Sequence, residues 1–245
     1  MYLLFLLAVV AYFVVVAIKE VQKTKRLLSV PITEKVRVKN YLGIIAFGWG
    51  TLLAVLIMCL YAEINFTDIG LRRLSFDYNI WFNIAVFVLS GAVFAMCLYQ
   101  IIASFVSAEH RKAAMEMFGD DAGKSNYDKV IATLIPRSKK EKLVFLGVPI
   151  TAGIMEEILA RGFLFLIIQT LFPYLSIIFV VLISSVLFGV AHAYQGIIGV
   201  IKSTLLGVLF GCLYLVTGSL IPSIILHFFI DFTAVFMFNE KEMTV

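Results

Sequence analysis

Charged residues are scarce in this chain. Only 15% of its 245 residues are Asp, Glu, Lys or Arg, whereas 62% are hydrophobic. A soluble domain is about a quarter charged and about half apolar, so the composition excludes an ordinary soluble enzyme. The length accommodates about six to eight apolar segments of roughly 20 residues each, together with their loops. The sequence therefore predicts an all-α, polytopic helical membrane protein.

Cysteine pairs with metal-ligand spacing are also missing. Cys59, Cys97 and Cys212 lie far apart in apolar runs and form no C-x-x-C motif, so we interpret them as small buried residues. The net charge of +4 does not indicate a nucleic-acid partner. The basic residues gather in two loops beside apolar runs, where such residues set topology and meet anionic lipid.

About seven apolar runs are long enough to cross a lipid bilayer, and they predict seven transmembrane helices. In the fourth run we expect an interfacial lead-in from Leu143, followed by a span that begins at Pro149, since proline is favoured in the first helical turn. The predicted spans are residues 2–18, 41–61, 80–106, 149–170, 175–194, 197–216 and 220–238.

The distribution of Lys and Arg predicts the orientation. The segments 19–39 and 107–142 carry most of these residues, and cytoplasmic loops have such an excess. We therefore expect the N-terminus outside and the C-terminus in the cytoplasm. The first run has no positive n-region and no A-x-A site, so we do not expect it to be a cleaved signal peptide. Residues 108–118 and 127–135 are predicted as interfacial helices or a solvated linker, and the short loops suit a bacterial plasma membrane.

The stretch G-I-M-E-E-I-L-A-R-G-F-L places Glu156, Glu157 and Arg161 inside an apolar run. Ionised groups at that depth cost roughly 2.5–3.5 kcal/mol each on insertion, so they are candidates for a functional site. On a helix, Glu157 and Arg161 are i, i+4 and can form an ion pair, whereas Glu156 lies about 100° round the axis. One carboxylate would then hold structure while the other is free for proton chemistry. The spacing alone does not assign the two roles, and a purely structural ion cluster is the alternative.

Three more ionisable residues lie in the last spans: His192, His227 and Asp231. His227 and Asp231 are i, i+4, so the carboxylate is placed to orient the imidazole ring. Counting from the predicted span ends, we expect these groups to converge with Glu156 and Glu157 in a cavity that opens to the cytoplasm. The site is thus predicted in the last four helices.

No serine stands in a G-x-S-x-G context, and the cysteines have no local base. A carboxylate with two histidines instead indicates an activated water molecule. Two arrangements remain open. Glu156, His192 and His227 could bind Zn²⁺ with one open position. Alternatively, a glutamate could act directly as general base on water, with a histidine and the His227/Asp231 pair stabilising the oxyanion without any metal.

The three motifs E-E-x-x-x-R, F-x-x-x-H and H-x-x-x-D, together with T-D-I-G-L-R-R before the third span, resemble those of a known family. They are similar to the CPBP intramembrane proteases, the CAAX-protease and bacteriocin-processing (Abi) family. The resemblance covers about residues 149–231. It implies that residues 143–238 form a catalytic core, preceded by three spans and a basic loop in residues 1–142, within one integral membrane domain.

The resemblance also implies an activity and residue roles. The expected activity is an intramembrane endopeptidase, often described as a metalloprotease, that acts on a membrane-associated peptide or protein of the CAAX, bacteriocin or signal-peptide type, with or without a lipid group. Glu156 would activate water with His192, while His227 and Asp231 would bind the oxyanion. Glu157 and Arg161 would support them. The CAAX branch favours asparagine at the position of Asp231, and a carboxylate there is a better metal ligand or histidine orienter than an oxyanion donor.

Two other functions compete with the protease. A non-catalytic immunity or scaffold protein would bind a peptide or a partner protein in the same cavity, and it is expected to lack a motif residue. An ion-coupled carrier would use buried carboxylates as a proton relay, and it is expected to have broken helices in both halves of the chain. All motif residues are present and the polar groups gather in the C-terminal half, so the sequence favours the protease. The oligomeric state is not encoded in any motif.

Overall fold

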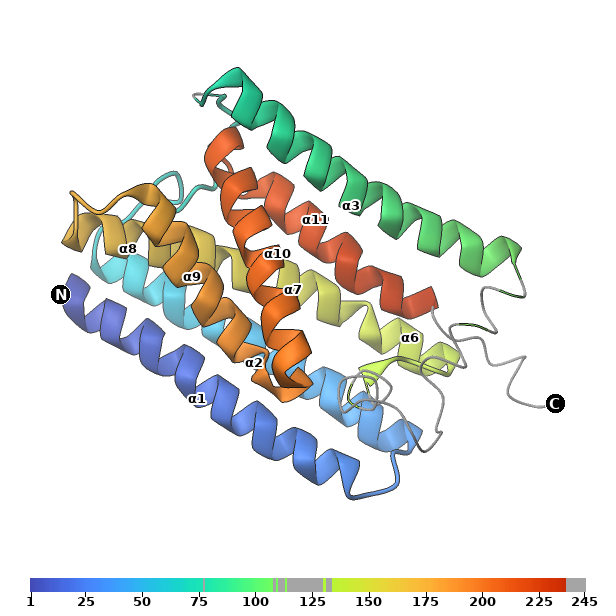
Figure 1. Cartoon of the computed structure of the whole chain (residues 1–245). Coiled ribbons are helices and arrows are strands. Elements are labelled where there is room, and N and C mark those ends of the chain that lie inside the picture. Colours follow the sequence, from blue (N-terminus) through green and yellow to red (C-terminus); the bar gives the residue numbers. More distant parts are fainter. Residues whose placement is uncertain (77, 108, 110–112, 114–129, 131–133, 237–245) are drawn as a thin grey trace.

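The computed structural model describes all residues except 77, 108, 110–112, 114–129, 131–133 and 237–245. Within the described residues, every regular element is a helix (Figure 1). Five helices are long and apolar enough to cross a membrane, and two shorter apolar helices, Ile177–Ala191 and Ile221–Phe236, accompany them. The predicted all-α polytopic class is confirmed. The predicted segments 108–118 and 127–135 fall mostly outside the described part of the chain.

The first three helices are α1 (Tyr2–Leu28), α2 (Glu34–Tyr61) and α3 (Ile80–Val106). The third agrees with the predicted span. The first two are longer than predicted, because much of the basic segment expected as a loop is helical. Lys, Arg, Gln and Glu are good helix formers, so the apolar run continues into a charged helix end. The second helix starts where the side chain of Thr33 accepts a hydrogen bond from the amide of Val36.

The fourth span is a helical run of 33 residues, Lys139–Leu171. It comprises α6 (Lys139–Phe145), α7 (Gly147–Glu157), the π-helix η1 (Ile158–Phe163) and α8 (Leu164–Leu171). It begins at Lys139, earlier than the predicted lead-in at Leu143, because Ser138 and Glu141 form a capping box at the start of the helix.

The last helices are α9 (Ile177–Ala191), the 3₁₀ turn η2 (Ala193–Gln195), α10 (Gly196–Thr217), α11 (Ile221–Phe232) and the 3₁₀ turn η3 (Thr233–Phe236). With its 15 residues, α9 spans about 22 Å, which is less than the roughly 30 Å of a hydrocarbon core. Its C-terminal cap is His192. The helix is therefore too short to cross the hydrocarbon core by itself, and irregular backbone within that core is tolerated only inside the protein or along a cavity.

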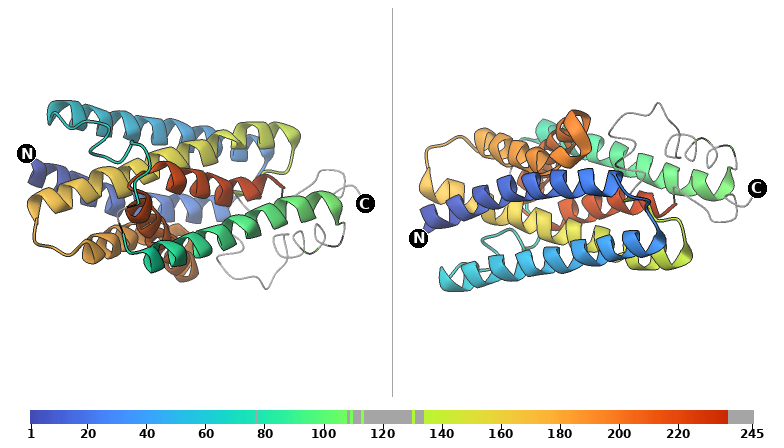
Figure 2. Two further views of the ribbon diagram at one scale, coloured as in Figure 1. Left: turned by 90° about the horizontal axis from the view of Figure 1, so that it is seen from above. Right: turned by 90° about the horizontal axis from the view of Figure 1, so that it is seen from below.

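Close helix approaches bring the motif-bearing segments together. A Cβ atom on Gly153 of α7 would lie 3.1 Å from the carbonyl oxygen of Ile224 in α11, and one on Gly207 of α10 would lie 3.0 Å from Cα of Ser185 in α9. Figures 1 and 2 show α1 and α3 on opposite sides of this core. Residues of α1 and α2, among them Val9 and Leu52, belong to the same apolar cluster as Leu159 and Phe163. The N-terminal and C-terminal spans thus form one packed bundle.

Candidate active site

The two adjacent carboxylates have different environments. Glu157 and Arg161 are both fully buried, and Nη1 of Arg161 lies 2.9 Å from Oε1 of Glu157. The side chain of Glu156 is 25% exposed and lines a cavity. The i, i+4 pairing predicted from the spacing is confirmed. The structure also answers the question that the spacing left open, since Glu157 is the paired carboxylate and Glu156 is the one that faces the cavity.

A π-helix follows the two carboxylates directly and contains Arg161. Such single-turn widenings often occur at functional sites. The carbonyl of Ala160, inside this turn, accepts a hydrogen bond of 2.8 Å from the hydroxyl of Ser184 in α9. A Cβ atom on Gly162 would lie only 2.6 Å from the carbonyl oxygen of Ile69. The hydrogen bond and the close approach at Gly162 fix the helix that carries Glu157 and Arg161 against its neighbours.

Aromatic rings hold the guanidinium of Arg161. Its Cζ atom lies 4.4 Å from the centre of the Phe188 ring and 5.4 Å from that of Phe210. Among the described residues, Nε and Nη2 have no hydrogen-bond partner. One ion pair and two π faces therefore compensate the buried charge. A Cβ atom on Gly207 would lie 2.9 Å from Nη2, so the guanidinium fills the space that this glycine leaves.

Glu157 also orients His227. Nδ1 of the ring lies 3.0 Å from Oε1 of Glu157, the oxygen that accepts from Arg161. An ionised carboxylate only accepts hydrogen bonds, so Nδ1 carries a hydrogen. The ring stacks on Phe210, with centroids 5.0 Å apart and planes inclined by 15°. These contacts fix the ring and leave Nε2 as the nitrogen available for chemistry.

The sequence predicts that Asp231 orients the ring of His227, and the structure places the two side chains beside each other, with a closer contact to the ring made by Glu157. Oδ2 of Asp231 lies 3.6 Å from Nε2, whereas the 3.0 Å contact at Nδ1 belongs to Glu157. Glu157 stands 70 residues earlier in the chain, and no sequence spacing could have shown the contact. Asp231 instead lies beside the free nitrogen, to which Oε2 of Glu156 also approaches within 3.9 Å.

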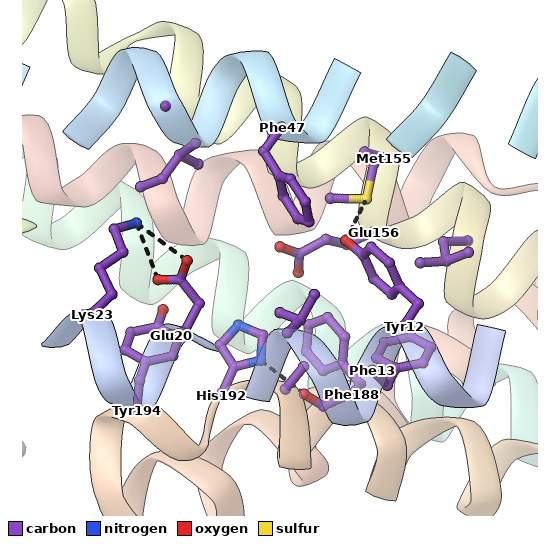
Figure 3. Close-up of a pocket in the computed structure, with 15 residues that line it drawn as sticks. Tyr12, Phe13, Glu20, Lys23, Phe47, Met155, Glu156, Phe188, His192 and Tyr194 are labelled. Carbon is purple, nitrogen blue, oxygen red and sulfur yellow. Dashed lines mark hydrogen bonds and ion pairs between the residues drawn. The ribbon is translucent and has the colours of Figure 1, made fainter. Parts of the chain in front are cut away.

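His192 faces the same cavity as Glu156 (Figure 3). Its Nδ1 lies 2.8 Å from the carbonyl oxygen of Phe188. A carbonyl is an acceptor only, so Nδ1 donates and the neutral ring keeps a lone pair on Nε2. The cavity has a volume of about 160 Å³. Oε2 of Glu156 is buried without a hydrogen-bond partner among the described residues. The site thus offers a basic carboxylate oxygen and an acceptor nitrogen to a small molecule such as water.

Helices α1 and α2 complete the cavity, which the sequence did not predict. Its walls include Tyr12, Glu20 and Lys23 from α1 and Phe47 from α2. The Tyr12 and Phe47 rings are stacked, with centroids 6.0 Å apart, and Nζ of Lys23 lies 3.2 Å from Glu20. Tyr12, Val16, Glu20 and Lys23 share one helix face by their spacing. That spacing places the four residues on one face of α1, but it does not predict which helix this face packs against.

Within the described residues, the oxygen and nitrogen atoms of Glu156, His192 and His227 do not form a preformed zinc site. In the part of the chain that the structure describes, no group of three His, Cys, Asp or Glu side chains is placed to hold a metal ion. One nitrogen of His227 is also committed to Glu157. The hypothesis of Zn²⁺ bound by Glu156, His192 and His227 therefore stays a prediction, and we derive no catalytic step through a metal.

Comparison with known proteins supports the resemblance noted in the sequence. Residues 139–233 match the family model described as "Type II CAAX prenyl endopeptidase Rce1-like". No curated protein and no solved structure matches the chain. The matched segment runs from α6 to the start of η3 and contains Glu156, Glu157, Arg161, His192, His227 and Asp231. The match supports intramembrane endopeptidase activity in general. The matched segment excludes α1 and α2, which line the cavity.

Proposed function

We propose that this chain, whose residues 139–233 carry an Rce1-like CAAX endopeptidase domain, hydrolyses a peptide bond with a water molecule activated by Glu156. The observation that carries the proposal is the division between the two adjacent carboxylates. Glu157 is fully buried, paired with Arg161 and bonded to His227. Glu156 is partly exposed to a cavity that it shares with His192. Of these two carboxylates, Glu156 is therefore the one that can exchange a proton with a molecule in that cavity.

In the proposed reaction, a water molecule lies between Glu156 and Nε2 of His192. His192 accepts one hydrogen bond from the water and orients it, while Glu156 removes the other proton. The water oxygen attacks the scissile carbonyl carbon and forms a tetrahedral oxyanion. The proton on Glu156 then passes to the leaving nitrogen, and the C–N bond breaks to give a carboxylic acid and an amine. The second water proton, still on the new acid, then passes to the amine, which leaves a carboxylate and an ammonium group.

In this proposal, His227 stabilises the oxyanion. Glu157 holds its Nδ1–H at 3.0 Å, and Nε2 faces Asp231 and Glu156 at 3.6 and 3.9 Å. In its imidazolium form, the ring has a hydrogen on both nitrogens. Its Nε2–H would donate to the developing oxyanion, an interaction that contributes most where water is excluded. Asp231 then acts through His227 as a positioning residue.

The substrate is proposed to be a membrane-associated peptide or protein in extended form. A cavity of about 160 Å³ accommodates the scissile bond and its water, but no folded domain. Its walls are mostly apolar and aromatic, with Phe13, Phe47 and Leu159 among them. Such walls suit both a lipidated CAAX-type C-terminus and an apolar bacteriocin or signal peptide. In the proposed bacterial plasma membrane, the cavity opens toward the cytoplasm.

The test is cleavage of lipidated and unlipidated peptides by purified protein in liposomes. Glu156→Gln is compared with the exposed control Glu63→Gln. We expect the Glu156 variant to lose roughly 10²–10⁴-fold in kcat/KM with an unchanged melting temperature, and the control to keep the wild-type rate. Wild-type cleavage by Glu156→Gln would refute the assignment. If the wild type and both variants bind the peptide tightly but none of them cleaves it, the result would favour the scaffold alternative.

A further inference from the structure

A second groove lies on the side of the bundle away from the catalytic cavity. It has a volume of about 650 Å³ and is open along one side, a size within the range of roughly 300–1,000 Å³ common for ligand sites. Its walls come from α3, α10 and α11, which Figure 1 shows as neighbours. Apolar side chains line most of it, with Phe87, Phe94, Leu213, Ile225 and Leu226 among them.

Two arginines of the T-D-I-G-L-R-R stretch border the groove. Nε of Arg72 donates to the carbonyl oxygen of Gly218 at 2.6 Å, so its guanidinium is held beside the connection between α10 and α11. Arg73 is exposed and lines the same groove. Among the described residues, it has no ion-pair partner. The groove therefore combines a long apolar wall with cationic groups from one loop.

A buried hydroxyl inside the groove has no hydrogen-bond partner within the described part of the chain. Ser90 of α3 is 8% exposed, and its Oγ atom makes no hydrogen bond with the described residues. Serines in an apolar helix commonly satisfy the hydroxyl on the carbonyl one turn back, as Ser104 does on Gln100 at 2.7 Å in the same helix. The hydroxyl of Ser90 is thus available to an acceptor atom of a ligand.

The geometry points to a binding site for an anionic phospholipid in this groove. We propose that an acyl chain lies along the apolar wall between α3 and α11. The phosphate group contacts Arg72 and Arg73, and an oxygen of the lipid accepts from Ser90. Charge complementarity selects this occupant, because the guanidinium groups of two arginines at one end of the groove attract a phosphate group and can donate hydrogen bonds to its oxygens. A peptide or a second copy of the chain would itself have to supply an acidic group at the end of the groove where Arg72 and Arg73 lie.

Gly91 provides a direct way to close the groove. It lines the groove, and a Cβ atom placed on it would meet no heavy atom within 4 Å. Gly91→Leu therefore adds a side chain to empty space and improves helix propensity. Gly50 of α2 is the matched control, since it also has no neighbour within 4 Å of a Cβ atom but does not line this groove.

The test measures lipid binding by native mass spectrometry of the full chain, titrated with phosphatidylglycerol or with zwitterionic phosphatidylcholine. The wild type and Gly50→Leu should retain one phosphatidylglycerol in preference to phosphatidylcholine. Gly91→Leu should lose this bound lipid. Arg73→Gln should weaken phosphatidylglycerol binding by about fivefold, which corresponds to the usual effect of one basic residue near anionic lipid.

Either of two results of the lipid titration would overturn the proposal, and a third result would assign the groove to another occupant. One is equal retention of phosphatidylglycerol by Gly91→Leu and Gly50→Leu. The other is equal binding of both lipids by the wild type. A dimer that is lost in Gly91→Leu would assign the groove to a second copy of the chain instead. Peptide cleavage is not part of this test, so its outcome is independent of the proposed protease activity.

Discussion

Replacing Arg161 by methionine should destabilise the protein strongly. The guanidinium and the Glu157 carboxylate are both fully buried at 2.9 Å, and removal of one partner from such a pair costs about 3–5 kcal/mol because the remaining charge has no compensation. Methionine keeps the volume and the contact with the Phe188 and Phe210 rings. The decrease in stability is therefore caused mainly by the uncompensated charge of the Glu157 carboxylate. Domain stabilities are about 5–15 kcal/mol, so this single change removes a large share.

The double variant separates charge compensation from packing. Glu157→Gln together with Arg161→Met removes both charges, and glutamine still offers an acceptor to Nδ1 of His227. We expect the double variant to be more stable than Arg161→Met alone, with a coupling energy of at least about 1 kcal/mol in the double-mutant cycle.

The assay is unfolding in mixed micelles with increasing SDS, followed by the fluorescence of Trp49 and Trp81. Arg26→Met, at an exposed position near the end of α1, is the control and should unfold like the wild type. The reasoning is refuted if Arg161→Met is as stable as this control. It is also refuted if the double variant is as unstable as the sum of its single changes.

Three further predictions follow from other contacts. Glu141 is fully buried and accepts from Nε of Arg37 at 2.8 Å, so Glu141→Ala should lower the free energy of unfolding by about 3 kcal/mol; an unchanged SDS midpoint would contradict this. Gly153→Val should destabilise by about 1–3 kcal/mol because its side chain meets the α11 backbone, whereas Gly50→Val, in open space, should change the melting temperature little. If Glu156 acts without a metal, peptide cleavage should persist after EDTA treatment and dialysis, while loss of activity that added Zn²⁺ restores would establish a zinc mechanism.

The helices, and the resemblance of residues 139–233 to the Rce1-like family model, could be predicted from the sequence because both depend on local patterns. Apolar runs of about 20 residues indicate spans, and the three motifs lie within single segments. The pairing of Glu157 with Arg161 is also local, since one helical turn separates them. The ends of the helices could not be predicted in the same way. The charged continuation of α1 to Leu28 consists of good helix formers, but an excess of Lys and Arg is also typical of a cytoplasmic loop.

Only the tertiary structure decided which groups face one another. The contact between Glu157 and His227, the ring of Phe210 beneath that histidine and the entry of Tyr12 into the cavity all join distant segments. Helical periodicity gives the face on which a residue lies, but it does not give the partner of that face. That choice depends on the packing of several helices at once, where small residues such as Gly153 and Gly207 set how closely two backbones approach.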